Sequence, residues 1–255
     1  SEAFLEQLNL FGEEENSVQQ ATEGPIASER VAEMVKAFPK LYLGTSSWSF
    51  PGWKGLIYAE EYGETKLAQL GLRAYSRVGL FRTVSLDRTY YRPMTVSEYK
   101  TLSSQVPETF RFVVKAPRDL LVPGASGFDL VRFTREFVEP TQRGLGEKLG
   151  VILIQFPPGT HAEYGSTFVS QLRELLKSLP RGPVYSLEVR DEELLGPHLQ
   201  QAMIGTGCAL CASIHPRLPG LDQQFLRVPP TPEVPLVFRW NLRPSLGYLE
   251  ARARF

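Results

Sequence analysis

Net charge, long apolar runs, cysteine and histidine are all scarce or absent in this chain of 255 residues. The 28 basic side chains are balanced by 28 acidic ones, so no general electrostatic field draws the chain to nucleic acid or to an anionic membrane. No apolar run approaches the roughly 20 residues that span a bilayer, and we therefore expect no membrane protein. The chain starts with acidic residues, where a secretory signal would be basic and then apolar, and this predicts a cytoplasmic protein.

Two cysteines and three histidines leave little material for redox or metal chemistry. Cys208 and Cys211 have the CxxC spacing of a redox pair or of half a zinc site. They lie in the apolar run CALCASI, however, which predicts a buried strand, and there residues three apart point to opposite faces with Cα atoms about 10 Å apart. His161, His198 and His215 are not clustered with other ligand types. We therefore expect inert core thiols, no bound metal and no cofactor.

The chain divides by pattern into a short arm and one long folded part. Residues 1–26 are polar, acidic and without periodicity, which predicts a mobile arm ahead of a single domain over residues 27–255. Within that domain, short apolar runs that end in polar residues are typical of buried strands. Seven such runs begin at Leu41, Phe81, Phe110, Gly150, Pro183, Cys208 and Pro235.

Most segments between these strands are long enough for a helix and carry apolar residues at helical spacing. Strand, helix and strand in repetition predict parallel pairing with right-handed crossovers. The α/β class expected is a TIM-like (β/α) barrel of mainly parallel strands rather than a doubly wound sheet, because no strand is followed by a GxGxxG turn. Helices are expected over residues 28–38, 65–78, 95–106, 127–141 and 166–179.

Alternation along the strands separates a face toward the helices from a face toward the barrel interior. On the fifth strand, Glu188 and Arg190 alternate with apolar residues and are expected to face the interior. The same rule turns Lys115 on the third strand, and Arg239 and Asn241 on the seventh, to the inside. These side chains stand at the C-terminal ends of their strands, which is where barrel proteins place their sites.

Seven sequence blocks resemble one known family in the same order. The block LYLGTSSWSFPGWKGLIY over residues 41–58 is similar to the opening signature of the YecE-like family, catalogued as domain of unknown function 72, whose members are barrels. Blocks such as SLDRTYY and HPRLP resemble one subgroup of it, and the resemblance covers residues 38–255. The family has no settled activity, so the resemblance implies a fold and a place for the site without naming a reaction.

Two departures from the family pattern limit what the resemblance implies. Ser85 stands where a better-known branch has a glutamate, so no role of that glutamate is carried over. Relatives continue past the position of Phe255 into a last helix and a last strand. The resemblance therefore implies a barrel that lacks its last strand in this chain, either because the chain is cut short or because the remainder is not part of this sequence. Since an open sheet edge invites aggregation, we expect something to cover it.

Basic side chains at the predicted strand ends indicate an anion site. Guanidinium and ammonium groups that converge at one rim match phosphate or carboxylate oxygens. The alternative is that each cation pairs with a neighbouring acid, but Asp87 and Glu188 are too few to neutralise them all. The expected ligand contacts are Arg88, Lys115, Arg118, Gln155, Arg190, His215, Arg217, Arg239 and Asn241.

Aromatic and acidic residues at the same ends extend the prediction. Trp48 and Tyr90 would suit stacking of a base or a sugar ring, with packing over the barrel top as the alternative. Glu188 and Asp87 are candidates for acid–base catalysis, with structural pairing as the alternative.

Two functions remain open from the sequence. One is a metal-independent hydrolase or lyase that binds a small phosphate-bearing or carboxylate ligand. The other is a non-catalytic protein that binds nucleic acid or a nucleotide. The sequence favours neither of these two functions, and it predicts no oligomeric state.

Overall fold

The structure is a computed structural model that describes residues 17–22, 26, 28–165, 167–232 and 234–241. The described residues form two compact units. The first holds those up to Ser85 together with Thr101–Arg111, and the second holds Leu86–Lys100 together with those from Phe112 onward. All seven expected strands are present, and the pairings within each unit are parallel. The predicted α/β class with parallel strands is therefore confirmed.

In the first unit, β1 (Leu43–Thr45) pairs with β2 (Phe81–Leu86), and α3 (Glu64–Arg77) connects them. The hydroxyl of Tyr75 on α3 fastens both strands, because it accepts from Thr45 N at 3.0 Å and donates to Thr83 O at 3.1 Å. Burial raises the pKa of Tyr75 to about 12, which keeps the donating proton in place. The unit also contains α2 (Glu29–Ala37) and the 3₁₀ turn η1 (Pro51–Trp53).

Part of the stretch expected to be a mobile arm is packed on the first unit. Val18 and Ala21 are buried, and Ala21 N donates to Ile57 O at 2.8 Å. Ala59 N donates to Gln19 O at 3.0 Å. Backbone hydrogen bonds thus hold residues 18–21 against the first unit. The sequence did not predict this contact, because it is short and the residues around it are acidic and without periodicity. Residues 1–16 and 23–25, and the predicted features beyond Asn241, lie outside the described residues.

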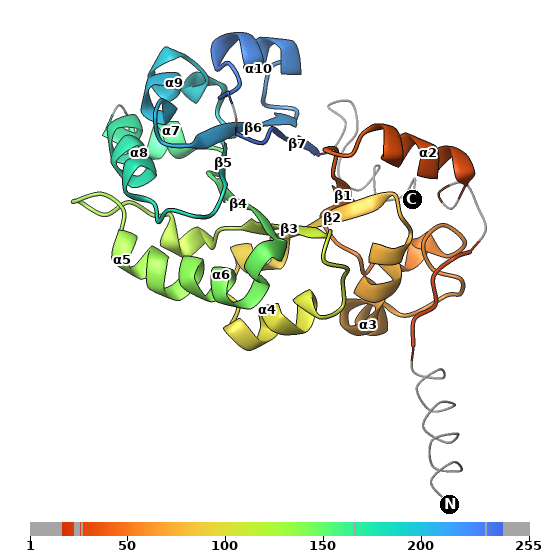
Figure 1. The fold of residues 1–255 in the computed structure, drawn as a ribbon. Helices are drawn as coiled ribbons and strands as arrows, with labels where there is room; N and C mark the ends of the chain where they lie inside the picture. Colours follow the sequence, from red (N-terminus) through yellow and green to blue (C-terminus); the bar gives the residue numbers. More distant parts are fainter. Residues whose placement is uncertain (1–16, 23–25, 27, 166, 233, 242–255) are drawn as a thin grey trace, which may run out of the picture. The chain divides into compact units, whose positions relative to one another are not determined.

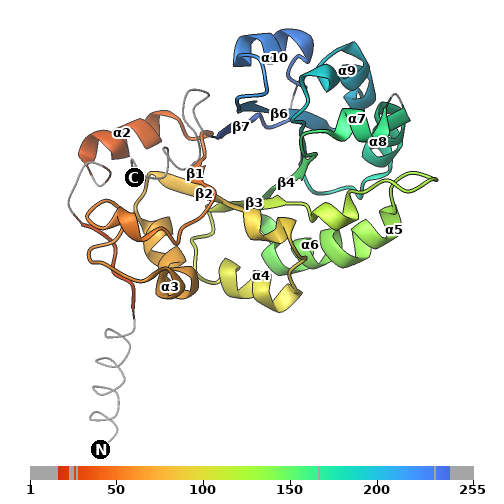
Figure 2. The ribbon, with the colours of Figure 1, turned by 180° about the vertical axis from the view of Figure 1, so that it is seen from behind.

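The second unit is built on a sheet in the order β3-β4-β5-β6-β7. Its helices lie along one face of these strands in both views of the ribbon (Figures 1 and 2). The registers pair Gln155 with Glu188 and Ser213 with Arg239, so polar side chains stand next to each other across neighbouring strands. The strands are β3 (Arg111–Lys115), β4 (Leu149–Gln155), β5 (Tyr185–Glu188), β6 (Cys208–Ile214) and β7 (Val237–Trp240).

The five expected helices are present, with two differences from the prediction. The helix predicted over residues 127–141 is interrupted by a π-helical turn, η4 (Thr134–Val138). Three further helices, α7, α9 and α10, were not predicted, because they are only five to seven residues long and give little periodicity. The α-helices from α4 onward are α4 (Val96–Ser103), α5 (Leu130–Phe133), α6 (Glu139–Leu145), α7 (Thr160–Tyr164), α8 (Thr167–Ser178), α9 (Pro197–Met203) and α10 (Leu221–Arg227). The 3₁₀ turns are η2 (Asp87–Tyr90), η3 (Arg118–Leu120), η5 (Gly146–Lys148) and η6 (Glu192–Leu194).

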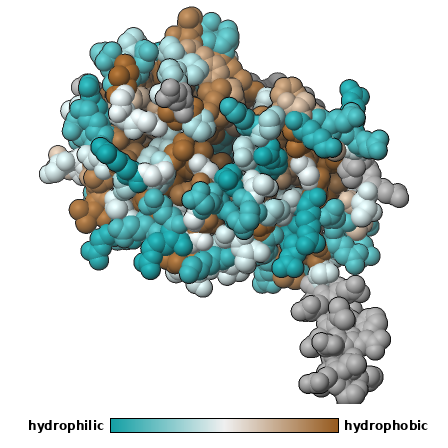
Figure 3. Space-filling view, viewed as in Figure 1, coloured by the Kyte–Doolittle hydropathy of each residue, from teal (hydrophilic) through white to brown (hydrophobic). Residues whose placement is uncertain are grey.

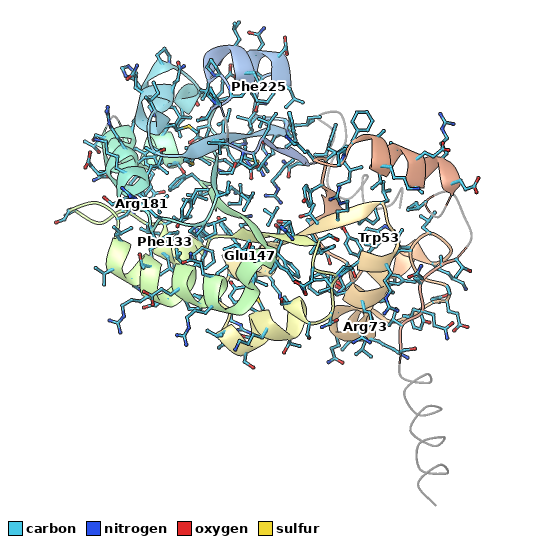
Figure 4. All side chains as sticks on the ribbon, in the orientation of Figure 1. Trp53, Arg73, Phe133, Glu147, Arg181 and Phe225 are labelled. Carbon is cyan, nitrogen blue, oxygen red and sulfur yellow. The ribbon has the colours of Figure 1, made fainter. Side chains whose placement is uncertain are left out.

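Aromatic rings and buried thiols fill the core of the second unit. Phe133, labelled in Figure 4, lies 5.4 Å from Phe137 between ring centroids, and Phe156 contacts Phe168 edge to face. Cys208 and Cys211 are buried and free. Burial raises the pKa of the Cys208 thiol to about 12, so it stays protonated and unreactive. The prediction that both thiols lie in the core is confirmed, and their inertness stays a prediction.

Hydrophilic and hydrophobic side chains are interspersed over the face seen in Figure 3. Within the part of the chain that the structure describes, no helix has both the length and the apolar character needed to cross a membrane.

We predict that Gly44→Ala destabilises the protein by about 2–3 kcal/mol. A Cβ at this position of β1 would overlap the carbonyl oxygen of Thr83 on β2, and backbone cannot move aside as a side chain can. Gly63→Ala is the matched control, because nothing lies within 4 Å of a Cβ there. Urea unfolding measures both variants, and equal midpoints for the two would contradict the clash.

A capping box opens α4, which gives a second prediction. Thr95 N donates to Glu98 Oε2 at 2.7 Å, and Glu98 N donates to Thr95 Oγ1 at 3.2 Å. Arg92 pairs with the same carboxylate at 2.7 Å, and these contacts lower the pKa of Glu98 to about 2.

Because the folded pKa lies below the unfolded value, the carboxylate stabilises the fold above the unfolded pKa, and this contribution is lost as pH falls toward 2. Wild type should therefore exceed Glu98→Gln in stability at pH 7, and the difference should shrink between about pH 4.5 and pH 2. Unfolding of both proteins across this range is the measurement, and a gap independent of pH would contradict the assignment.

Candidate functional site

Arg239 on β7 joins two carboxylates at the C-terminal ends of the strands. One terminal nitrogen donates to Asp87 Oδ2 at 2.7 Å, and the other donates to Glu188 Oε2 at 3.1 Å. Asp87 follows β2 directly, and Glu188 is the last residue of β5. Alternation predicted that Glu188 and Arg239 share the interior face, and the structure brings their side chains into contact.

Glu188 lies between two guanidinium groups. Its side chain has no exposed surface, and its Oε1 lies 2.7 Å from a terminal nitrogen of Arg190. That contact is ionic, since the angles required for a hydrogen bond are not met. Burial lowers the pKa of Arg190, the adjacent Glu188 raises it, and the guanidinium remains charged. Both oxygens of Glu188 thus hold arginines, which is the structural pairing that the sequence left as the alternative to catalysis.

Lys115 ends β3 and points at an aromatic ring. Its ammonium lies 4.0 Å from the centroid of the Tyr90 ring, and the residue is only 9% exposed. Thr89 fixes this arrangement, because its hydroxyl donates to Lys115 O at 2.5 Å and to Leu86 O at 2.6 Å. Among the described residues, Lys115 has no ion-pair partner. Burial lowers its pKa, the effect of Asp87 opposes this, and the effect of Arg239 adds to it.

Two amides and an imidazole complete the polar surroundings. Gln155 is buried at the end of β4, beside Glu188 in register. Asn241 Oδ1 accepts from Arg190 at 3.4 Å, while its Nδ2 is buried and has no partner among the described residues. His215 Nδ1 accepts from Arg217 N at 3.2 Å, and burial and then Arg190 lower the pKa of the imidazole. His215 is therefore neutral at pH 7.

Three predicted arginines lie on the surface of the second unit. Arg118 and Arg217 are exposed, and Arg118 acts on the ring hydroxyl of Tyr90 by lowering its pKa against the larger effect of burial. Arg88 is also exposed, and its electrostatic neighbours are Glu98 and Arg92. Arg88 is thus engaged with the start of α4.

Trp48 belongs to the first unit and is described there alone. It is buried, and its indole Nε1 donates to Leu67 O at 3.0 Å. Its carbonyl accepts from the hydroxyl of Tyr58. These contacts correspond to the packing alternative that the sequence offered for this residue.

Sequence reasoning missed three residues that support the strand ends. Thr89 ties the η2 turn to β3, as described above. Asp191 accepts from Gly159 N at 2.7 Å and from His161 N at 2.8 Å, which joins the end of β5 to the start of α7. Gln224 on α10 bonds both backbone groups of Ser213 at 2.8 and 3.1 Å. Asp191 in the block SLEVRD stands directly after a strand, a signal that could have found it, whereas nothing local marks Gln224.

The cluster of Asp87, Lys115, Glu188, Arg190 and Arg239, hereafter the ion cluster, contains three cations and two carboxylates. Both carboxylates are engaged by arginines, so one positive charge is left over, and it belongs to Lys115. The side chain of Asp87 is 33% exposed, so this carboxylate can be reached from outside the ion cluster. In the described part of the chain, no group of three or more His, Cys, Asp or Glu side chains is placed to hold a metal ion. The absence of a metal stays a prediction.

Parallel strands with a buried ion cluster at their C-terminal ends define an α/β protein of the class whose sites lie at that edge. The family model described as "Protein of unknown function DUF72" matches residues 42–253, and the chain belongs to this family. The resemblance noted from the sequence blocks is thereby confirmed, whereas the subgroup stays a prediction.

Two solved structures are similar in fold. A DUF72 family protein from Enterococcus faecalis has a TM-score of 0.57 and 23% identity, covering 84% of this chain and 75% of that one. A DUF72 family protein from Thermotoga maritima has a TM-score of 0.56 and 26% identity, covering 80% of this chain and 75% of that one. A comparison with curated proteins finds no match.

We predict that Glu188→Gln destabilises the protein by about 3–5 kcal/mol, because it leaves two buried guanidinium groups without their shared counter-ion. Glu192→Gln is the matched control. Glu192 pairs with Arg227 at 2.9 Å on the surface, where the two side chains are 48% and 37% exposed. That change should cost less than about 1 kcal/mol. Chemical unfolding separates the two cases, and a loss below about 1 kcal/mol for Glu188→Gln would show that the pair contributes little.

Proposed function

We propose that the C-terminal strand ends of the second unit bind a small anion, either phosphate-bearing or a carboxylate, with Lys115 as the cation that meets it. The observation that carries this proposal is the leftover charge of the ion cluster. Asp87 and Glu188 already pair with arginines, and Lys115 is 9% exposed without an ion-pair partner among the described residues. A largely buried cation without a counter-ion is unfavourable, and a bound anion removes that cost.

Buried polar atoms without hydrogen-bond partners support the same proposal. Within the described residues, Arg190 Nε and Asn241 Nδ2 are donors of this kind, and Glu188 Oε1, which has only its ionic contact with Arg190, is an acceptor of this kind. Buried polar groups are normally hydrogen-bonded, so the hydrogen bonding of this part of the site is incomplete. A ligand that brings oxygen acceptors to this end of the strands would bind Lys115 directly and would reach the two donors after small side-chain shifts.

If the protein is an enzyme, the ion cluster suits a metal-independent hydrolase or lyase. Asp87 is then the acid–base group, since its side chain is 33% exposed and within reach of a ligand. Glu188, fully buried between Arg190 and Arg239, acts as a positioning residue that holds both guanidinium groups toward the ligand.

One observation favours the second candidate, a nucleic-acid or nucleotide binder. Tyr91 is 83% exposed and packs edge to face on Tyr90 with ring centroids 5.5 Å apart. Exposed aromatic rings beside a cation suit stacking of a base above a phosphate contact. The exposed Arg118 and Arg217 would then follow the backbone of a longer ligand.

We predict that Lys115→Met weakens binding of inorganic phosphate about tenfold or more, since a charge-assisted hydrogen bond contributes about 1.5–3 kcal/mol. Thermal stabilisation by phosphate measures the affinity, because a ligand of the native state raises the melting temperature. Lys177→Met, an exposed change on α8, is the control and should leave the affinity unchanged.

A single-stranded oligonucleotide titrated at two salt concentrations separates the candidates. Binding that falls steeply with salt indicates a nucleic-acid ligand, because several counterions are released together. A weak salt dependence, with phosphate binding alone, supports the small-anion site. If neither probe stabilises the protein, the ion cluster is structural and the proposal fails.

A further inference from the structure

Lys115 combines features that a purely structural lysine does not need. It is the last residue of β3, so its backbone belongs to a rigid element, and Thr89 holds its carbonyl oxygen at 2.5 Å. Its ammonium lies over the Tyr90 ring at 4.0 Å, and the residue as a whole is 9% exposed. We propose that Lys115 is an amine nucleophile that forms an imine with a small carbonyl compound carrying a carboxylate or phosphate group. This inference rests on the proposed anion site and names the chemistry of its ligand.

The contacts of Lys115 leave its lone pair available once the proton is lost. A structural lysine at this burial normally pairs with a carboxylate, and that bond would hold the proton on nitrogen. Here Arg190 and Arg239 occupy the two nearby carboxylates instead. The face of the Tyr90 ring attracts the ammonium but accepts no strong hydrogen bond from it. The ring therefore orients the nitrogen and leaves its lone pair available after the proton is lost.

Electrostatics around Lys115 point the same way. Burial is the main cause that lowers its pKa, and Arg239 and Arg190 lower it further, whereas Asp87 and Glu188 raise it. Tyr90, the remaining titratable group in contact with it, is neutral, since burial raises the pKa of its hydroxyl. Each unit of lowering increases the fraction of neutral amine at pH 7 about tenfold. Partial burial near cations is a known way to activate lysine for attack on a carbonyl.

The step balances with the groups present. The neutral amine of Lys115 attacks the carbonyl carbon, a C–N bond forms, and the carbonyl π electrons pass to oxygen to give a carbinolamine after proton transfer. Addition of a proton from solvent to the hydroxyl releases water and leaves a protonated imine. That cation accepts the electron pair of an adjacent C–C or C–H bond, which is the chemistry of a lyase. The acid group of the ligand offsets its charge.

Reductive trapping tests this inference on the full chain. The protein is incubated at pH 7 with pyruvate, or with dihydroxyacetone phosphate, together with sodium cyanoborohydride, which reduces the imine to a stable amine. Peptide mass spectrometry then locates the adduct. We expect Lys115 to be labelled about tenfold or more faster than the exposed Lys54 and Lys177, because the acid group of the ligand holds its carbonyl carbon beside the amine of Lys115. Acetone, which has a carbonyl but no acid group, should show little preference for Lys115.

Denatured protein and two variants provide the controls. Preference for Lys115 should disappear in urea. Lys115→Arg should abolish the preferred adduct, whereas Lys148→Arg, a change at another buried lysine, should retain it. The wild-type labelling pattern itself needs no variant, so the inference stays testable if Lys115→Arg does not fold.

Thermal stabilisation by pyruvate or by dihydroxyacetone phosphate without reductant separates this inference from the anion site. Stabilisation without an adduct at Lys115 would overturn the imine and leave the anion site standing. Neither stabilisation nor adduct would overturn both, and labelling spread evenly over all lysines would also overturn the imine.

Discussion

The bridge from Arg239 to Asp87 and Glu188 is the contact on which the second unit depends. Asp87 lies in the η2 turn, which Thr89 fastens to the end of β3, and Arg239 lies on β7, the strand at the other end of the order β3-β4-β5-β6-β7. In a flat sheet, strands four positions apart would be separated by roughly 20 Å. The bridge is 2.7 Å long, although the two residues are 152 apart in sequence. The sheet must therefore curve, and the curvature turns the polar side chains of its concave face toward one another.

The charged side chains that the curved sheet brings together are buried, and burying them has an energetic cost that apolar side chains would not have. Glu188 has no exposed surface, and both of its oxygens face guanidinium groups. Replacing a buried ion network by apolar side chains is often neutral or stabilising, so burial of these charges is weak evidence for stability. Removal of one charged side chain nevertheless lowers the stability strongly, since it leaves the others buried without counter-ions. The ion cluster thus constrains its own composition, because no paired member can be replaced alone without leaving a buried charge unpaired.

Sequence pattern predicted the strands well because each is a short apolar run ended by a polar residue. Alternation also predicted the shared face of Glu188, Arg190 and Arg239, since the side-chain period of a strand allows only two faces. The partner of each charge was not predictable in this way. Asp87 meets Arg239 through the curvature of the sheet, which no local pattern contains. Gln224 and the helix α10 that carries it were missed for a related reason, because a seven-residue helix is stabilised by packing more than by propensity.

The ion pairs distinguish the basic side chains of the ion cluster from one another. The sequence treated the basic side chains as equivalent ligands for an anion, but the structure commits Arg190 and Arg239 to Glu188 and Asp87. An anion that drew either arginine away would leave a buried carboxylate unpaired, at a cost of several kcal/mol. Lys115 carries no such penalty, and its position over the Tyr90 ring holds it at the strand ends. Arg118 and Arg217 are exposed, and in the proposed site charges at such positions would change the rate of encounter with an anion more than its affinity. In the proposed anion site, selectivity for the ligand would therefore depend on Lys115, the member of the ion cluster that pairs with neither carboxylate.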